Sequence, residues 1–238
     1  MRSLKPTFLS FDFFIDILFP NRCPGCGRVV AWNELFCNEC ESKIEYLDDL
    51  PWYELFPDKV NEKMRSYDYA NAVFKYEGTA KNAVLSLKNH GAVHFADFAA
   101  ERLVLKLESD EIFDIDIITA VPIHKSKRLS RGYNQAEIFA DAMGKRLEAD
   151  CDFSILGHDK SKKAQHELSG GERYKAAENT YFIKDKSRSL KGKNVLLCDD
   201  IVTTGSTVDI CSQLLKEMGS EKVYVASICR TQSLKLKA

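Results

Sequence analysis

The sequence lacks both an excess of charge of one sign and a long apolar run. Its 238 residues carry 34 Lys and Arg against 35 Asp and Glu, which leaves a formal net charge of −1. Binding of nucleic acid or membrane through bulk charge is therefore not expected, and only a local basic stripe could serve that purpose. No apolar stretch approaches the length of a membrane-spanning helix. With 45% hydrophobic and 29% charged residues, the composition is that of an ordinary soluble protein with one sizeable domain and a small appendage.

The first 19 residues are rich in apolar and aromatic side chains, but they do not read as a signal peptide. Asp12 and Asp16 interrupt the apolar run at residues 8–19, and no small-residue cleavage site follows it. The two acids are four residues apart, so they would share one face of a helix. We predict that residues 1–19 form an amphipathic helix that docks on the protein itself. Membrane-surface binding is the alternative, although such helices usually carry Lys and Arg on the polar face.

Four of the eight cysteines stand in one compact pattern. Cys23-Pro-Gly-Cys26 is followed, after ten intervening residues, by Cys37-Asn-Glu-Cys40, and two such turns can place four thiolates around one Zn²⁺. Because the protein supplies all four ligands, the zinc would be structural rather than catalytic. Reduced thiols or two disulfides are the alternatives. The scattered remaining cysteines suit a reducing compartment, and we expect the protein to be cytoplasmic.

The stretch at residues 195–207 combines an apolar run, an acidic pair and a turn rich in hydroxyl groups. The run at 195–198 predicts a buried parallel strand, and a helical apolar pattern begins at Val208. Backbone N–H groups of such a turn, together with the helix N-terminus, attract an anion. The Lys of a P-loop is missing. The adjacent carboxylates suit ribose hydroxyls, directly or through Mg²⁺. The alternative is a capped strand–turn–helix with solvated aspartates.

Three further segments are candidate binding loops. Residues 88–91, Lys-Asn-His-Gly, form either a pyrophosphate loop or a helix C-cap. The basic segment 127–135 follows a predicted strand at 115–121 and forms either a binding loop or a solvated basic loop. The polar segment 157–173 lacks periodicity and reads as a mobile lid.

After residue 72 the chain alternates predicted strands and helices. This alternation indicates an α/β fold with a mostly parallel sheet, whose site lies at the carboxyl ends of the strands. We divide the chain into an N-terminal helix (1–19), a zinc ribbon (20–45), a connector or cover over the site (46–71) and the main domain (72–238).

Several of these motifs together resemble a known family. Residues 195–207, with Asp-Asp, two variable residues and Thr-Thr-Gly-Ser-Thr, resemble the phosphoribosyl pyrophosphate (PRPP) motif of type I phosphoribosyltransferases. In addition, the paired CxxC turns, Val121-Pro122-Ile123-His124 and Arg131-Gly132-Tyr133-Asn134-Gln135 occur in the order seen in the ComF family. The chain is therefore identified as a member of this family of competence-associated, phosphoribosyltransferase-like proteins with a zinc ribbon. The resemblance covers residues 19–230, but the lid departs from the family pattern at Lys162-Lys163-Ala164 and by an inserted Ser169-Gly170-Gly171.

The resemblance implies a type I phosphoribosyltransferase fold that binds PRPP with Mg²⁺ and a role in DNA uptake and natural transformation. Transfer of phosphoribose passes through an oxocarbenium-like transition state, and we assign catalytic roles to Asp199, Asp200 and the lid residue Lys163. The 5-phosphate would meet the turn, and the pyrophosphate would meet two cations and Mg²⁺; these binding residues are Thr203, Thr204, Gly205, Ser206, Thr207, Lys88 and Arg131. The zinc ligands would be Cys23, Cys26, Cys37 and Cys40.

A non-catalytic role in DNA import is the alternative to an enzyme. No residue in the sequence identifies an acceptor base, and Tyr133 or Phe182 as a stacking face is only a guess. The family resemblance also implies binding of single-stranded DNA and a helicase-like ATPase as a partner. DNA contact would use Lys125, Lys127, Arg128, Arg131 and the lid lysines, and would depend strongly on salt.

Overall fold

The computed structural model describes residues 20–31, 33–56, 59–60, 63–90, 92–159 and 180–231. The predicted N-terminal helix (1–19) lies outside these residues. So does most of the predicted lid, including Lys163.

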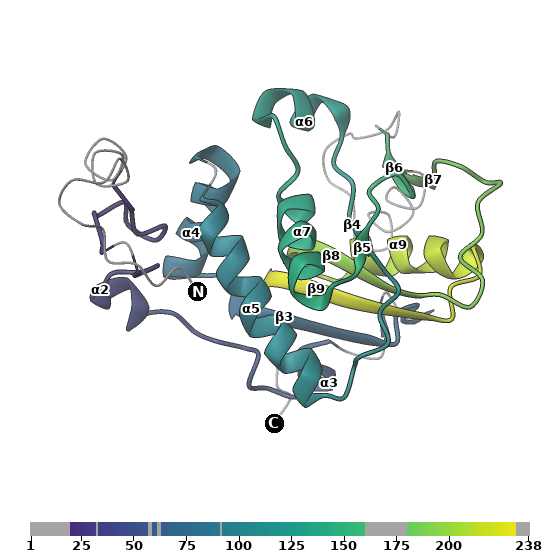
Figure 1. The fold of residues 1–238 in the computed structure, drawn as a ribbon, viewed down its shortest axis with the longest axis horizontal. Coiled ribbons are helices and arrows are strands. Elements are labelled where there is room, and N and C mark those ends of the chain that lie inside the picture. Colours follow the sequence, from purple (N-terminus) through teal and green to yellow (C-terminus); the bar gives the residue numbers. More distant parts are fainter. Residues whose placement is uncertain are drawn as a thin grey trace.

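A five-stranded parallel sheet forms the centre of the molecule (Figure 1), in the order β3-β9-β8-β4-β5. The apolar run at 195–198 lies in the middle strand β8, where it is fully buried, as expected for a parallel sheet covered on both faces. Strand β8 pairs with β9 on one side and with β4 on the other. The strands are β3 (Tyr69–Lys75), β4 (Ile117–Ala120), β5 (Asp150–Cys151), β8 (Asn194–Val202) and β9 (Lys222–Arg230).

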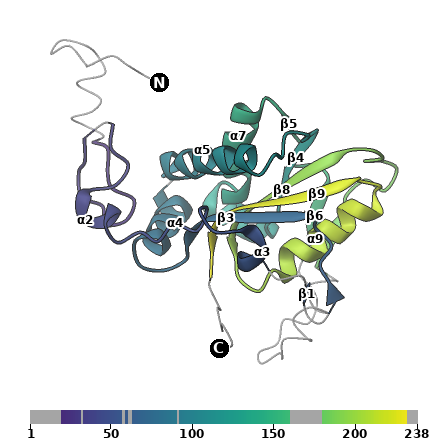
Figure 2. The same ribbon diagram turned by 90° about the horizontal axis from the view of Figure 1, so that it is seen from below.

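Helices cover both faces of the sheet. One face is packed by α4 (Gly78–His90), α5 (Val93–Ser109) and α7 (Gln135–Leu147), and the other by α3 (Trp52–Leu55) and α9 (Ser206–Glu217). Figure 2 shows the sheet between α5 and α7 on one side and α3 and α9 on the other. Among the described helices, none combines the length and the apolar character that crossing a bilayer requires. The predicted α/β fold with a mostly parallel sheet is confirmed.

Two short antiparallel hairpins lie outside the main sheet. Strands β1 (Lys59–Val60) and β2 (Lys63–Met64) form the first. Strands β6 (Leu156–His158) and β7 (Tyr181–Ile183) form the second, and residues 160–179 connect its two strands. Strand β7 therefore pairs with β6 directly beside the segment predicted as a lid.

The segment predicted as a connector borders the sheet. Residues 45–47 extend along β3, with hydrogen bonds from Leu47 N to Val73 O at 2.7 Å and from Lys75 N to Glu45 O at 3.0 Å. Asp48 accepts two hydrogen bonds from the Arg102 guanidinium, at 2.6 and 3.1 Å, which ties the segment to α5. This pairing covers an edge strand that would otherwise expose unpaired backbone groups.

The basic segment 127–135, predicted to be a loop, is largely helical. Helix α6 spans Lys125–Arg131. Its N-cap is His124, whose side chain accepts the Ser126 N–H, and its C-cap is Gly132, which has a left-handed φ of 82°. None of its residues is buried, so it carries no apolar periodicity that the sequence could have revealed. Its two caps hold it instead.

Candidate functional site

The acidic pair lies at the carboxyl end of β8, where that strand leads into α9. Gly205 has a left-handed φ of 83° and is the N-cap of α9, a conformation that a residue with a Cβ resists. Thr204 Oγ1 and Ser206 Oγ lie 2.9 Å apart in this turn. The first α9 amide bonded within the helix is that of Asp209, to Gly205 O at 2.9 Å. The amides of Thr207 and Val208 therefore face the helix end, where the dipole attracts an anion.

The two aspartates have different environments. Asp199 is 8% exposed, and its carboxylate accepts the Asp200 N–H at 2.8 Å. Burial, followed by the neighbouring Asp200 charge, raises the pKa of Asp199 well above its usual value. Asp200 instead forms an ion pair, with Lys88 Nζ 2.6 Å from Asp200 Oδ2. The two aspartates therefore differ: Asp199 retains its proton unusually strongly, whereas the Asp200 carboxylate has a cationic partner.

The structure brings Lys88 to the acidic pair from a distant part of the sequence. Lys88 lies in the last turn of α4 rather than in a loop, because the helix continues to His90. Gly91, the other end of the predicted loop, lies outside the described residues. The Tyr133 hydroxyl donates to Leu87 O at 2.5 Å, so the segment after α6 holds the end of α4 in place. Tyr133 is thus an anchor for the residue next to Lys88.

Arg131 and its neighbours lie after β4, the strand beside β8 in the sheet. Arg131 Nη1 donates to Gln135 Oε1 at 3.2 Å. Asn134 is buried and structural, since it donates to Val121 O at 3.0 Å and caps α7. Gln135 is also buried, and its Nε2 has no hydrogen-bond partner among the residues that the structure describes. Because parallel strands end at one edge of the sheet, this segment borders the same edge as the acidic pair.

Two histidines pack together near the hydroxyl-bearing turn. The rings of His124 and His158 lie 5.7 Å apart, and the ring of His158 lies edge-on to Tyr181 at 4.9 Å. Burial raises the pKa of Tyr181, and the nearby Thr207 side chain opposes this change. Burial lowers the pKa of His158, and the nearby His124 and Lys127 lower it further, while Asp159 opposes this change. Tyr181 therefore links hairpin β6–β7 to the start of α9, and the half-buried imidazole of His158 packs against Tyr181.

This histidine predicts a loss of stability at mildly acidic pH. The folded-state pKa of His158 lies below the ordinary value of 6.5, so the unfolded chain binds this proton more readily and stability falls as pH drops below that value. Replacing His158 with glutamine should reduce the decrease in melting temperature between pH 7.5 and 5.5 by about 1–2 °C, a modest effect because the ring is only half-buried. The exposed His94 offers the control H94Q, which should leave the decrease unchanged. An equal decrease in H158Q and wild type contradicts the prediction.

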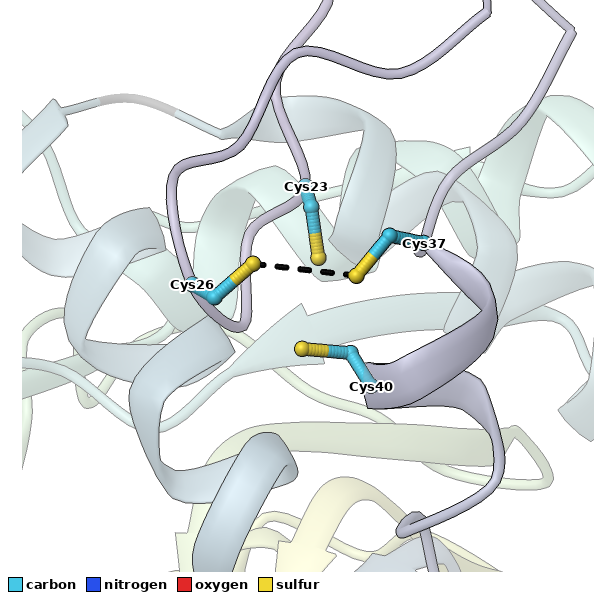
Figure 3. A group of neighbouring side chains, drawn as sticks. All are labelled: Cys23, Cys26, Cys37 and Cys40. Atoms are coloured by element: carbon cyan, nitrogen blue, oxygen red, sulfur yellow. Dashed lines mark hydrogen bonds between the residues drawn. The ribbon is translucent and has the colours of Figure 1, made fainter.

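The four clustered cysteines converge as the CxxC spacing predicts. Their Sγ atoms all lie within 4.8 Å of one another, and those of Cys26 and Cys37 are 3.7 Å apart (Figure 3). A backbone hydrogen bond from Cys40 is the main cause that lowers the pKa of Cys37 to about 7, which favours the thiolate that binds metal. Four thiols at these distances fit a tetrahedral Zn²⁺.

The ribbon shares the core of the main domain. Phe36 packs edge-on against Phe95 and Phe98 of α5, at 5.9 and 6.5 Å. A Cβ on Gly25 would lie 2.5 Å from Thr79 Cγ2 of α4, so only glycine permits this close approach. Figures 1 and 2 both place α2 (Asn38–Glu41) of the ribbon beside α4.

Two surface hollows lie away from the acidic pair. One, of about 420 Å³, is at the amino edge of the sheet and is lined by Trp52, Tyr69, Phe113 and Tyr224 among others. The other, of about 650 Å³, is on the ribbon beside Val29 and Glu34. Neither is lined by a residue predicted to bind PRPP, although the predicted zinc ligand Cys37 lines the second.

Comparison with known proteins covers both parts of the chain. Residues 129–237 match the family model of the phosphoribosyl transferase domain, and residues 14–50 match that of a double zinc ribbon domain. The DNA utilization protein YhgH of Escherichia coli K12 is 25% identical over 88% of this chain and 84% of its own length. Competence protein F of Haemophilus influenzae is 22% identical over 87% and 84%, and competence protein ComFC of Streptococcus pneumoniae is 24% identical over 82% and 87%. These relatives and the two domain matches confirm the resemblance to the ComF family that the sequence motifs indicated.

Solved structures similar to this chain include two phosphoribosyltransferases. A hypoxanthine phosphoribosyltransferase from Staphylococcus aureus has a TM-score of 0.38 at 15% identity, over 58% of this chain and 64% of that one. An adenine phosphoribosyltransferase from Saccharomyces cerevisiae has a TM-score of 0.38 at 14% identity, over 62% and 74%.

Sequence reasoning found the acidic pair, the hydroxyl-bearing turn and the cysteines, but it missed three contacts. It did not predict that Lys88 would pair with Asp200, that Tyr133 would anchor α4, or that the two histidines would pack together. All three join residues more than thirty positions apart in the sequence. Phe182, the other guessed stacking residue, lies against Gly157, where a Cβ would be 2.4 Å from its ring.

Proposed function

We infer that the carboxyl end of β8 binds PRPP together with Mg²⁺, and that the protein acts as a phosphoribosyltransferase on an acceptor yet to be identified. The observation that carries this proposal is the convergence of an acidic pair, a lysine ammonium and an anion-attracting helix end at one edge of the sheet. Carboxylates, hydroxyl groups and cations are the groups that a sugar bearing both a phosphate and a pyrophosphate needs. The phosphoribosyl transferase family match supports the same proposal.

Each part of the site has a separate task in this proposal. The turn from Thr203 to Thr207 would hold the 5-phosphate through its amides and hydroxyl groups. Asp199 and Asp200 would form hydrogen bonds with the ribose hydroxyls, and the negative charge of Asp200 would stabilise positive charge that develops on the sugar as pyrophosphate departs. Lys88 and Arg131 would neutralise the pyrophosphate. When bound, Mg²⁺ would supply further positive charge there, held by ligand oxygens and Asp200.

The closure of the site is part of the same proposal, and it concerns residues outside the described ones. Lys163 would approach the pyrophosphate from the segment between β6 and β7, and closure would exclude water that hydrolyses PRPP. Tyr181, which directly follows this segment in β7, lies beside Thr207 of the turn that would hold the 5-phosphate.

Calorimetry with PRPP and Mg²⁺ tests this function. We expect one site per chain with a dissociation constant in the micromolar range, about −8 kcal/mol, and no comparable binding of ribose without phosphates. A screen of nucleobases for release of pyrophosphate then identifies the acceptor. Absence of PRPP binding in a folded, zinc-loaded protein contradicts the proposal.

A non-catalytic role in DNA handling is the second candidate, and one observation favours it. Helix α6 has no buried residue, and Lys125 and Lys127 are exposed along it. The names of the relatives refer to DNA utilization and competence. Single-stranded DNA bound there should dissociate as salt rises, because the contacts would be electrostatic. Binding that does not respond to salt, or no binding at low salt, argues against this surface.

A further inference from the structure

In the free protein, a lysine ammonium already forms an ion pair with one member of the acidic pair. Lys88 Nζ lies 2.6 Å from Asp200 Oδ2, and the two side chains are only 17% and 18% exposed. The Lys88 charge also acts on Asp199, whose pKa it lowers against the larger effect of burial. The place where a ligand cation or a ribose hydroxyl would meet Asp200 is therefore filled by the protein itself.

The backbone that carries Lys88 has a fixed position. Leu87 is fully buried, and its carbonyl oxygen accepts the Tyr133 hydroxyl at 2.5 Å. Lys88 can leave Asp200 by rotation of its long side chain while α4 stays in place, since a lysine side chain has four flexible bonds. The ion pair can thus open without unfolding the helix.

Opening this pair has different consequences for different ligands. A free divalent cation that binds Asp200 expels the ammonium and leaves it largely buried without a partner, which is unfavourable. A ligand that carries its own anionic groups gives the displaced ammonium a new partner. The same lysine therefore opposes the first ligand and favours the second.

We propose that Lys88 makes this site selective for a metal-carrying pyrophosphorylated sugar over the free metal ion, by exchanging Asp200 for the anionic end of the ligand. The proposal rests on the proposed function. It adds that the metal enters together with the sugar pyrophosphate rather than before it, and that Lys88 sets this order.

Calorimetric titration of the full-length, zinc-loaded protein with MgCl₂ alone, and with PRPP plus Mg²⁺, tests the proposal. K88Q should bind Mg²⁺ at least tenfold more tightly than wild type, and PRPP with Mg²⁺ at least tenfold more weakly. K88R keeps the charge and should bind Mg²⁺ as weakly as wild type does. The matched control is K106Q. The Lys106–Asp110 ion pair has a similar distance of 2.7 Å and side-chain exposures of 17% and 22%, but it lies at the other edge of the sheet. K106Q should therefore leave both affinities unchanged.

The outcomes separate the proposal from the proposed function. If wild type binds PRPP with Mg²⁺ but K88Q binds Mg²⁺ no more tightly than wild type, the selectivity proposal is overturned and the function stands. If wild type does not bind PRPP with Mg²⁺, the function fails and the proposal fails with it. Thermal unfolding of each variant shows whether a change in affinity reflects the site or the fold.

Discussion

Replacing Asp200 with asparagine is expected to weaken binding of PRPP and Mg²⁺ by about 100-fold or more. A hydrogen bond to a charged group contributes about 1.5–3 kcal/mol, and a factor of ten in affinity corresponds to 1.4 kcal/mol. Asp200 would lose its charge toward both the ribose hydroxyls and the metal ion, so more than one such contact is affected. Calorimetry on D200N and wild type measures the difference directly.

Folding should survive this substitution. Asp200 is 18% exposed and asparagine has nearly the same shape, so melting temperature should change little while binding is lost. D110N is the matched control, since Asp110 is 22% exposed and also pairs with a lysine, 2.7 Å away. Unchanged PRPP affinity in D200N would remove Asp200 from the site.

Loss of the structural zinc is expected to lower the melting temperature by about 10 °C or more. Metal binding by clustered thiolates is coupled to folding, and for a chain of this size about 1 kcal/mol corresponds to 2–4 °C. The effect should extend beyond the ribbon, because Cys23, Cys37 and Cys40 belong to the same buried cluster as α4 and α5. Calorimetry before and after chelation, and on C40S, measures the change.

Metal analysis accompanies this experiment, and one zinc ion per chain is expected. C151S serves as the control, because Cys151 is half-buried, lies outside the cluster and donates to Ala140 O. The zinc assignment is wrong if the purified protein contains no metal and all four clustered thiols react with a thiol reagent.

The parts of the site that could be predicted from the sequence are formed by residues that are neighbours in the sequence. The strand, acidic pair, turn and helix at 195–217 depend on neighbouring positions, and β8 and α9 have the predicted order. The cysteine cluster likewise depends on two local turns with a fixed spacing, and its four sulfur atoms meet as expected. Local patterns of this kind carry their own geometry.

The parts that could not be predicted depend on tertiary packing or on caps. The sequence near Lys88 does not indicate that Asp200 is its partner, because packing in the hydrophobic core sets the position of α4 relative to β8. Strand β3 begins at Tyr69, three residues before the predicted start. Asn71 interrupts the apolar pattern there, and the structure compensates by pairing its side chain with the Tyr69 hydroxyl at 3.2 Å.

Helix α4 contacts both centres of the molecule. Near its first residues Thr79 lies against Gly25 of the zinc ribbon, and in its last turn Lys88 meets Asp200. A helix of 13 residues, about 20 Å long, therefore extends from the cysteine cluster to the acidic pair. Any rearrangement of the ribbon, by metal exchange, thiol oxidation or a bound partner, would tilt α4 and change the position of the Lys88 ammonium relative to Asp200.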